Sequence, residues 1–182
     1  KTGLRIMPEM IDLYNILMNN GIDVYVCSAS FIDVIMVSAT NTKYGLNVKP
    51  SNVFAMQLKT DSNGRYINQY DYNNYFQTQG AGKTKTIDKF IRPSHGGKGP
   101  ILVAGDSDGD YNMLSDYKDL KLGLIINRVK GGPIGKLSKQ AADTFGKGNA
   151  IYYLQGRNEN TGLFISTEKT ILLGGKEEKL VK

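Results

Sequence analysis

The sequence predicts an α/β protein built around a parallel sheet. Three short apolar runs, at 22–27, 101–105 and 122–126, have the length of buried strands. Each run is followed by a stretch with apolar residues at helical spacing, and this alternation is typical of parallel sheets. Because ligands bind at the carboxyl ends of parallel strands, we expect the functional residues directly after these runs.

The first part of the chain is typical of a helix, a strand and a second helix. Pro8 suits a first helical turn and Gly21 suits a helix end, so we expect a helix over about 8–20. The strand at 22–27 follows, and the apolar stretch after it predicts a helix over about 31–39.

Residues 45–80 predict an insertion made of a hairpin and a loop. Residues 53–58 are typical of a strand, and the Asp-Ser-Asn-Gly run at 61–64 is a turn signal. A return strand is expected at 65–67, and the polar stretch at 71–79 predicts a loop.

The rest of the chain continues the alternation of helices and strands. We expect helices over about 86–91, 109–117 and 134–144, a loop at 94–100, and strand-like pieces at 151–154 and 164–166. Residues 1–150 are expected to form the core of the protein. Residues 151–182 are expected to form an extension that packs on this core and ends in a charged, frayed tail from 174.

The composition excludes several kinds of protein. With 182 residues, 40% of them hydrophobic, the chain can bury a core, and no apolar run approaches the roughly 20 residues of a membrane span. The single cysteine, Cys27, excludes an internal disulfide, and the single histidine, His95, leaves little room for a histidine metal site. The net charge of +6 is spread along the chain among acids, so we expect no nucleic-acid partner.

Three acids with alternate spacing, Asp106, Asp108 and Asp110, follow the second apolar run. This spacing also occurs in calcium loops, which need glycine at the sixth position and glutamate at the twelfth. Those positions hold Tyr111 and Tyr117, so a calcium loop is excluded.

A magnesium site is a second interpretation of the same acids. Asp106 at the strand end and Asp110 at the start of the next helix can face one pocket. Mg²⁺ is commonly held by one or two carboxylates together with water and phosphate, and this pair could supply them. The alternative is that Ser107 and Asp108 are ordinary helix caps and that the acids only complement the helix dipole.

The glycine-rich stretch Gly-Ala-Gly-Lys-Thr at 80–84 resembles the end of a nucleotide-binding P-loop. A P-loop would need a glycine where Gln77 stands, and a buried strand where the chain is polar. We therefore reject the P-loop. Lys83 remains a candidate for binding phosphate as a point charge, with a solvated lysine near a helix start as the alternative.

Three small residues, Ser28, Ala29 and Ser30, follow the first strand. Small side chains let a ligand approach the backbone, and N–H groups at a helix start bind phosphate well. We therefore expect the three residues to bind phosphate or substrate, with the Ser28 hydroxyl as a further donor. The alternative is that Ser30 caps the following helix, and both roles are compatible.

Together these segments resemble three motifs of the haloacid dehalogenase (HAD) superfamily. A strand ends in Ser28, Lys83 opens a helix, and another strand ends in Gly-Asp-Ser-x-x-Asp-x-x-Met-Leu at 105–114. The chain is most similar to the phosphoserine phosphatase-like branch and its phosphorylcholine phosphatase-like members. That similarity rests on two segments, Met-Pro-Glu-Met at 7–10 and Val-Cys-Ser-Ala-Ser at 26–30, and on the Gly-Lys helix start at 82–83. The resemblance covers about residues 4–127.

The resemblance implies a three-layer α/β/α, Rossmann-like core and a Mg²⁺-dependent phosphomonoester hydrolase. Its substrate would be a small phosphorylated metabolite, such as phosphoserine or phosphocholine, and its intermediate an aspartyl phosphate. Ser28 would hydrogen-bond the phosphoryl group, and Lys83 would neutralise its charge. Asp106 would bind Mg²⁺, and Asp110 would be a ligand through water or a positioning group.

The sequence departs from the family pattern in two places. The first motif, Asp-x-Asp-x-Thr/Val, supplies the nucleophile and the general acid/base, and no segment here matches it. We therefore expect the nucleophile and the first central strand to lie upstream of Lys1, and residues 1–182 alone to be inactive. Ser-Ala-Ser stands at 28–30 where phosphoserine phosphatases typically have Ser-Gly-Gly, which argues against assuming phosphoserine.

Two other functions stay open from the sequence. The first is a phosphate- or Mg²⁺-binding domain without a nucleophile. The second is a structural domain whose acids are only helix caps. The sequence carries no signal for a cellular compartment or an oligomeric state.

Overall fold

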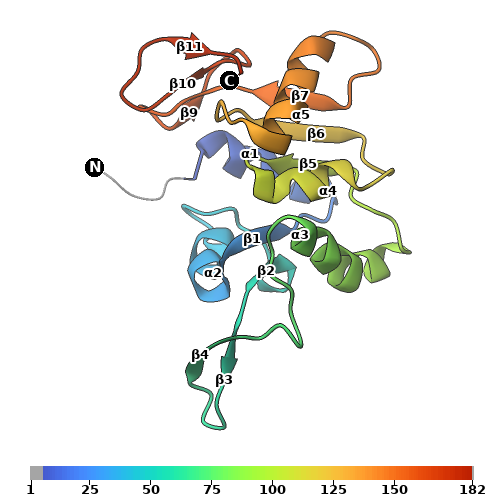
Figure 1. Ribbon diagram of the computed structural model, residues 1–182. Coiled ribbons are helices and arrows are strands. Elements are labelled where there is room, and N and C mark those ends of the chain that lie inside the picture. The colour runs from blue at the N-terminus through green and yellow to red at the C-terminus, as the bar shows by residue number, and fades with distance from the viewer. Residues whose placement is uncertain (1–5, 182) are drawn as a thin grey trace. The chain divides into compact units, whose positions relative to one another are not determined.

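The computed structural model describes residues 6–181, and the chain divides into two compact units, Lys1–Phe90 and Ile91–Lys182 (Figure 1). Both units contain helices and parallel strands, so the prediction of an α/β protein with parallel sheets is confirmed. Within the described residues, no helix combines the length and the apolar character needed to cross a membrane. The boundary expected at residue 150 stays a prediction.

The helices of the first unit lie close to where the sequence predicts them. Helix α1 spans Pro8–Asn19, with its proline at the first helical position. Gly21 follows with a φ of +76°, a backbone conformation that glycine adopts without steric cost and that ends a helix. Helix α2 spans Ile32–Thr40.

Strand β1 begins later than the sequence predicts. It spans Val26–Phe31 and pairs in parallel with β2, Val53–Met56, so that Val26 lies opposite Val53. A strand extends only as far as a partner supplies backbone hydrogen bonds, and β2 starts at Val53, directly after a 3₁₀ turn. The prediction of a strand at 22–27 is therefore wrong at both ends, and Ser28, Ala29 and Ser30 lie inside the strand.

A small apolar core holds these elements together. Ala39 and Val48 are each 1% exposed and Val53 is 6% exposed. Partly buried side chains pack around them: Tyr14, Met18, Val26, Ile32, Ile35, Met36 and Leu46. Helices α1 and α2 therefore pack through their apolar stripes, as an amphipathic helix must.

The predicted hairpin at 53–67 is confirmed, with a break. After β2, Gln57 interrupts the strand, and β3 (Leu58–Thr60) pairs antiparallel with β4 (Tyr66–Tyr70). The turn closes through a hydrogen bond from the Gly64 N–H to the Asp61 carbonyl at 3.0 Å. The side chains of β4 are all exposed.

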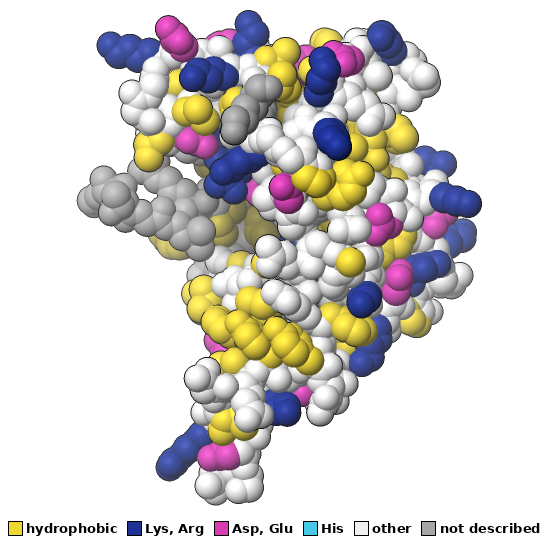
Figure 2. Space-filling view, in the orientation of Figure 1, with side chains coloured by type: hydrophobic (Ala, Val, Ile, Leu, Met, Phe, Trp, Pro, Cys, Tyr) yellow, Lys and Arg dark blue, Asp and Glu magenta, His cyan; other side chains and the backbone are white. Residues whose placement is uncertain are grey.

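Exposed aromatic rings connect this hairpin to the end of β1. The rings of Phe31 and Tyr70 stack with centroids 6.0 Å apart, and those of Tyr70 and Tyr72 stack at 5.1 Å. Phe31 is 38% exposed and Tyr72 is 52% exposed. Figure 2 shows apolar side chains gathered on the surface of this unit.

The helix after the loop starts earlier than expected. Helix α3 spans Ala81–Thr86 and continues as a π-helix, η2 (Ile87–Ile91), and a 3₁₀ turn, η3 (Arg92–His95). Lys83 is the third residue of α3, so its predicted place in a first helical turn is confirmed.

The second unit is built on a three-stranded parallel sheet. Its strands are β5 (Leu102–Gly105), β6 (Leu122–Ile126) and β7 (Tyr152–Gln155), in that order. Val103 lies opposite Gly123, and Gly123 lies opposite Tyr152. The strands predicted at 101–105, 122–126 and 151–154 are therefore confirmed within a residue.

Two helices pack on this sheet. Helix α4 spans Tyr111–Ser115 after a 3₁₀ turn, η4 (Asp108–Asp110), and is shorter than the predicted 109–117. Helix α5 spans Gly132–Thr144. The core lies between helices and strands and includes Leu114 at 0%, Ile125 at 1% and Ile134 at 2% exposure.

The extension after β7 forms a small sheet of its own. Its strands are β8 (Arg157–Asn158), β9 (Leu163–Phe164), β10 (Thr170–Ile171) and β11 (Glu178–Lys179), in the order β11-β10-β8-β9. The segment expected to fray from residue 174 thus contains a strand.

One buried side chain, Asn127, fastens this small sheet to the end of β6. Its amide donates hydrogen bonds to the carbonyls of Glu168 and Leu180, each at 2.6 Å. The Thr170 hydroxyl donates to the Asn127 carbonyl at 2.8 Å. Asn127 is 1% exposed, so these bonds also satisfy polar groups that water does not reach.

Candidate functional site

The predicted site residues fall into two groups, one in each unit. In the first unit the structure brings Ser28 together with Lys83, and in the second it brings Asp106 together with Asp110. The acids lie directly after β5, where ligands are expected to bind. Ser28 lies inside β1 instead, where the regular pairing with β2 is interrupted between Ser28 and Phe31.

Lys83 is buried, and its ammonium reaches the second residue of β1, Cys27. The side chain is 6% exposed, and Nζ donates a hydrogen bond to the Cys27 carbonyl at 2.6 Å. The alternative of a solvated lysine is therefore wrong. This contact places a positive charge beside β1, where it could attract an anion.

A clasp between the loop before α3 and β1 holds Lys83 in place. Thr78 is 2% exposed, and its hydroxyl donates a short hydrogen bond to the Ser28 carbonyl. Gly82 permits the tight turn, because a Cβ there would overlap the carbonyl oxygen of Gln77. Thr78 was not predicted, since its partner lies 50 residues away and the polar loop gives no local signal.

Ser28 is half-buried next to this clasp. Its hydroxyl oxygen accepts a hydrogen bond from the Ser30 N–H at 3.1 Å. A serine hydroxyl also carries one proton that it can donate, which is the group a phosphoryl oxygen would accept. Ala29 is exposed, and Ser30 is half-buried.

Ser30 is not the cap of the following helix. Helix α2 has Phe31 at its cap position, and among the described residues no side chain makes a cap hydrogen bond to it. The capping alternative for Ser30 is therefore wrong, and its backbone N–H orients Ser28 instead.

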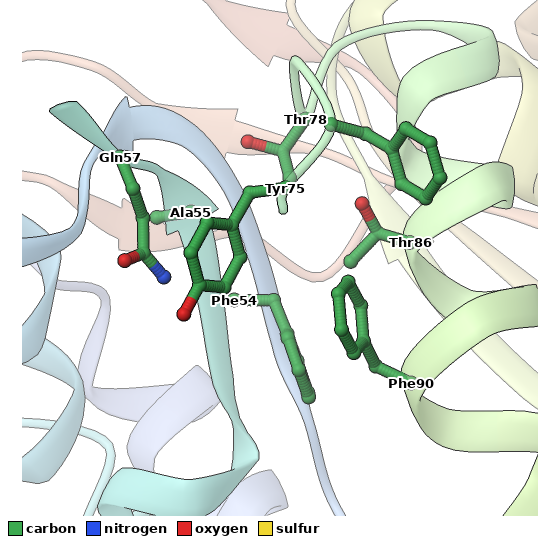
Figure 3. A pocket seen from close by; sticks show the side chains of 8 residues that line it. Phe54, Ala55, Gln57, Tyr75, Thr78, Thr86 and Phe90 are labelled. Carbon is green, nitrogen blue, oxygen red and sulfur yellow. The ribbon is translucent and has the colours of Figure 1, made fainter. Parts of the chain in front are cut away.

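A pocket lies beside Thr78, between β2 and the helix that carries Lys83 (Figure 3). It is lined by Phe54, Ala55, Gln57, Tyr75, Phe76, Thr78, Thr86 and Phe90. The rings of Phe54 and Phe90 stack with centroids 5.6 Å apart, which closes much of the space. The remaining volume holds about one water molecule, so it is a packing defect and not a substrate pocket.

In the second unit, Asp110 shapes the loop that carries Asp106. Its Oδ2 accepts hydrogen bonds from the Asp106 N–H at 2.9 Å, the Ser107 N–H at 3.1 Å and the Ser107 hydroxyl at 2.9 Å. Gly105 permits this approach, because a Cβ there would lie 2.5 Å from the Asp110 Cβ. Asp110 is 7% exposed, and these contacts support its positioning role.

Asp108 is a helix cap, but of a distant helix. Its Oδ1 accepts a hydrogen bond from the Ile134 N–H at 2.8 Å, in the first turn of α5. Gly132 has a φ of +73°, and a Cβ there would lie 2.5 Å from Asp108 Oδ2. A carboxylate at a helix N-terminus also complements the helix dipole.

The carboxylate of Asp106 faces a residue that the sequence did not reveal. Arg128 Nη1 lies 3.3 Å from Asp106 Oδ2, and the two side chains are 36% and 38% exposed. Arg128 follows β6, which is the strand next to β5 in the sheet. The carboxyl ends of adjacent parallel strands explain how residues 22 positions apart meet.

The acidic side chains of the second unit offer few ligands for a divalent cation. Among residues 6–181, no three His, Cys, Asp or Glu side chains are grouped so that they could hold a metal ion. Asp106 offers one carboxylate, while Asp110 Oδ2 is occupied by three hydrogen bonds. Mg²⁺ needs only one or two carboxylates when water and phosphate complete its coordination shell. These residues therefore suit an open Mg²⁺ site and not a site whose ligands all come from the protein.

No protein-family model matches the chain. Phosphorylcholine phosphatase from Pseudomonas aeruginosa is 35% identical over 148 residues, which are 68% of this chain and 41% of that protein.

Solved structures extend this comparison. A conserved protein of unknown function from Anaerococcus prevotii DSM 20548 has a TM-score of 0.86 and 36% identity, over 98% of this chain and 44% of its own. A phosphoserine phosphohydrolase-like protein from Francisella tularensis subsp. tularensis SCHU S4 has a TM-score of 0.49 and 19% identity over 66% of this chain and 50% of its own, too distant to bear on function. The chain spans less than half the length of the first two relatives.

Proposed function

Because this chain is homologous to phosphorylcholine phosphatase and belongs to the HAD-like phosphatases, we propose that it is part of a Mg²⁺-dependent phosphomonoester hydrolase. The observation that carries the proposal is the buried ammonium of Lys83, held 2.6 Å from the Cys27 carbonyl in β1, next to Ser28. A cation held beside Ser28 would provide charge neutralisation for a phosphoryl group bound there.

Lys83 and Ser28 would act on the transferring phosphoryl group. Phosphoryl transfer depends mainly on alignment and on stabilising charge that spreads over the equatorial oxygens. The ammonium would neutralise that charge, and the Ser28 hydroxyl would donate a hydrogen bond to one oxygen. Thr78 would keep both groups in place, because its hydroxyl ties the loop before α3 to the Ser28 carbonyl.

Asp106 would hold Mg²⁺, with Asp110 as the positioning group. When bound, Mg²⁺ would supply charge neutralisation on the substrate phosphate. The role of Asp110 follows from its three hydrogen bonds to Asp106 and Ser107, which set the direction of the Asp106 backbone.

The nucleophile is proposed to be an aspartate outside residues 1–182. Its carboxylate would attack phosphorus and release the alcohol, and water would then hydrolyse the aspartyl phosphate. No Asp-x-Asp-x-Thr/Val segment is present in the sequence, so residues 1–182 alone would not turn over substrate. The same missing segment would supply the first central strand of a three-layer α/β/α core.

Phosphocholine is the favoured substrate among small phosphomonoesters. Phe31 stands three residues after Ser28, and its ring stacks on Tyr70 with both rings partly exposed. Aromatic faces attract quaternary ammonium groups, whereas they offer nothing to the carboxylate of phosphoserine. Ser-Ala-Ser at 28–30 in place of Ser-Gly-Gly also weighs against phosphoserine.

The test is hydrolysis by the full-length protein. We expect Mg²⁺-dependent turnover of p-nitrophenyl phosphate and of phosphocholine, and loss of both in Asp106→Asn with an unchanged circular dichroism spectrum. Asp143→Asn is the matched control, because Asp143 is exposed and pairs only loosely with Lys139 at 3.4 Å. A folded full-length protein without Mg²⁺-dependent turnover would refute the proposal, and phosphate binding without turnover would favour the non-catalytic binding domain.

A further inference from the structure

Arg128 contacts the proposed metal ligand but has no part in the proposed reaction. Its Nη1 lies 3.3 Å from Asp106 Oδ2. Within the described residues its Nε is buried and has no hydrogen-bond partner. The Arg128 guanidinium therefore lies on the same carboxylate that is proposed to bind Mg²⁺. The guanidinium and Mg²⁺ are both positively charged, so they would repel each other if both were bound to Asp106.

The backbone holds Arg128 in this place at the expense of strain. The next residue, Val129, has a φ of +53°, which is unfavourable for a β-branched side chain. Such a conformation persists only where the surroundings over-determine it. Here the Val129 N–H donates to Asn127 Oδ1 at 2.8 Å, and Asn127 is itself fixed by two carbonyls of the C-terminal extension.

We propose that Arg128 is a positioning residue that competes with Mg²⁺ for Asp106, so that its guanidinium occupies the carboxylate until the cation displaces it. The inference rests on the proposed function, since it assumes that Asp106 is the metal ligand. The pair is a third exposed and makes a single contact, so it is weak enough to exchange. The C-terminal extension takes part indirectly, because its carbonyls fix Asn127, whose side chain in turn fixes the backbone after Arg128.

Substitution of Arg128 predicts a graded shift in Mg²⁺ affinity. Arg128→Gln removes the competitor, so the affinity for Mg²⁺ rises by about fivefold, the upper range for an exposed ion pair. Arg128→Lys keeps the charge but loses the fork geometry and gives an intermediate affinity.

The affinity is measured by isothermal titration calorimetry of the full-length protein with MgCl₂, without substrate. Lys139→Gln is the matched control, because it removes one positive charge from an exposed ion pair on α5 and should leave the affinity unchanged. Circular dichroism checks the fold of each variant.

The outcomes separate this inference from the proposed function. If Asp106→Asn binds Mg²⁺ as well as the unmodified protein does, the assignment of the metal ligand fails. If Asp106→Asn abolishes binding but Arg128→Gln leaves the affinity unchanged or lowers it, the competition is refuted and the metal site stands. A loss of inorganic phosphate binding in Arg128→Gln, with unchanged Mg²⁺ affinity, would instead make Arg128 an anion ligand.

Discussion

The ammonium of Lys83 donates a hydrogen bond to the carbonyl oxygen of Cys27 at 2.6 Å, from the first turn of α3 to strand β1. This contact joins two segments that are 56 residues apart in the chain. It gives a buried cation a defined position next to Ser28.

Replacing Lys83 by methionine should remove activity without unfolding the protein. Methionine has a similar length and suits a site that is 6% exposed, but it carries no charge for the phosphoryl group. We expect kcat/KM for p-nitrophenyl phosphate in the full-length protein to fall by about 10²–10³-fold, as for loss of one electrostatic group. Lys85→Met, in the exposed part of the same helix, is the control and should retain activity. Retained activity in Lys83→Met would remove Lys83 from the site.

Gly82→Ala should disrupt the clasp before α3. The added Cβ would overlap the backbone of Gln77, so the loop with Thr78 must move. We expect a loss of about 2 kcal/mol or more in the free energy of unfolding, measured in urea, because backbone cannot yield as a side chain can. Gly148→Ala is the control, since in the part of the chain that the structure describes nothing lies within 4 Å of its added Cβ. Equal free energies of unfolding for the two variants would show that the loop before α3 does not depend on the close approach of Gly82 to Gln77.

Asp108→Ala should lower stability but leave Mg²⁺ affinity nearly unchanged. The substitution removes the side-chain acceptor of the Ile134 N–H at the start of α5. Loss of a helix cap costs about 1 kcal/mol, which corresponds to a fall in melting temperature of about 2–4 °C for a chain of this size. Asp143→Ala, near the other end of α5 and exposed, should shift it by much less. A large loss of Mg²⁺ affinity would instead make Asp108 a metal ligand.

Glu159 should make stability depend on pH in the acid range. Burial raises the pKa of Glu159, but the hydrogen bond from the Leu173 N–H, the ion pair with Arg157 and the charge of Arg128 together hold it below the ordinary value of 4.5. A group whose pKa is lowered in the folded protein stabilises the fold when the pH is above the ordinary pKa of that group. This stabilisation is lost as the pH falls through the lowered pKa. In urea unfolding, the difference between the unmodified protein and Glu159→Gln should therefore be larger at about pH 7 than at about pH 3. A difference that is the same at both pH values would show that Glu159 acts through packing alone.

Elements with strong local signals were predictable from the sequence. Pro8 and Gly21 bound α1 within a residue, and the turn at 61–64 closes the hairpin as expected. The strands β5 and β6 begin and end almost where their apolar runs do. Strand β1 was misplaced because its limits depend on its partner, β2, and not on its own residues.

In the candidate site too, residues with a local sequence signal were predictable and residues that depend on distant partners were not. Ser28, Lys83, Asp106 and Asp110 stand in motifs that can be recognised by residue type and spacing. The side chains that orient these residues carry no such signal. Thr78, Asn127 and Arg128 act on partners 50, 41 and 22 residues away, and nothing in their neighbours marks them.

By itself the sequence determined the alternation of helices and strands, the acids after β5 and the lysine at the start of α3. These depend on interactions within a few residues, such as helix ends, turns and apolar periodicity. Only the tertiary structure decided that Asp108 caps α5, that Asp110 shapes its own loop and that Arg128 contacts Asp106. Those roles depend on which strands and helices become neighbours, and that follows from packing the whole core rather than from any one segment.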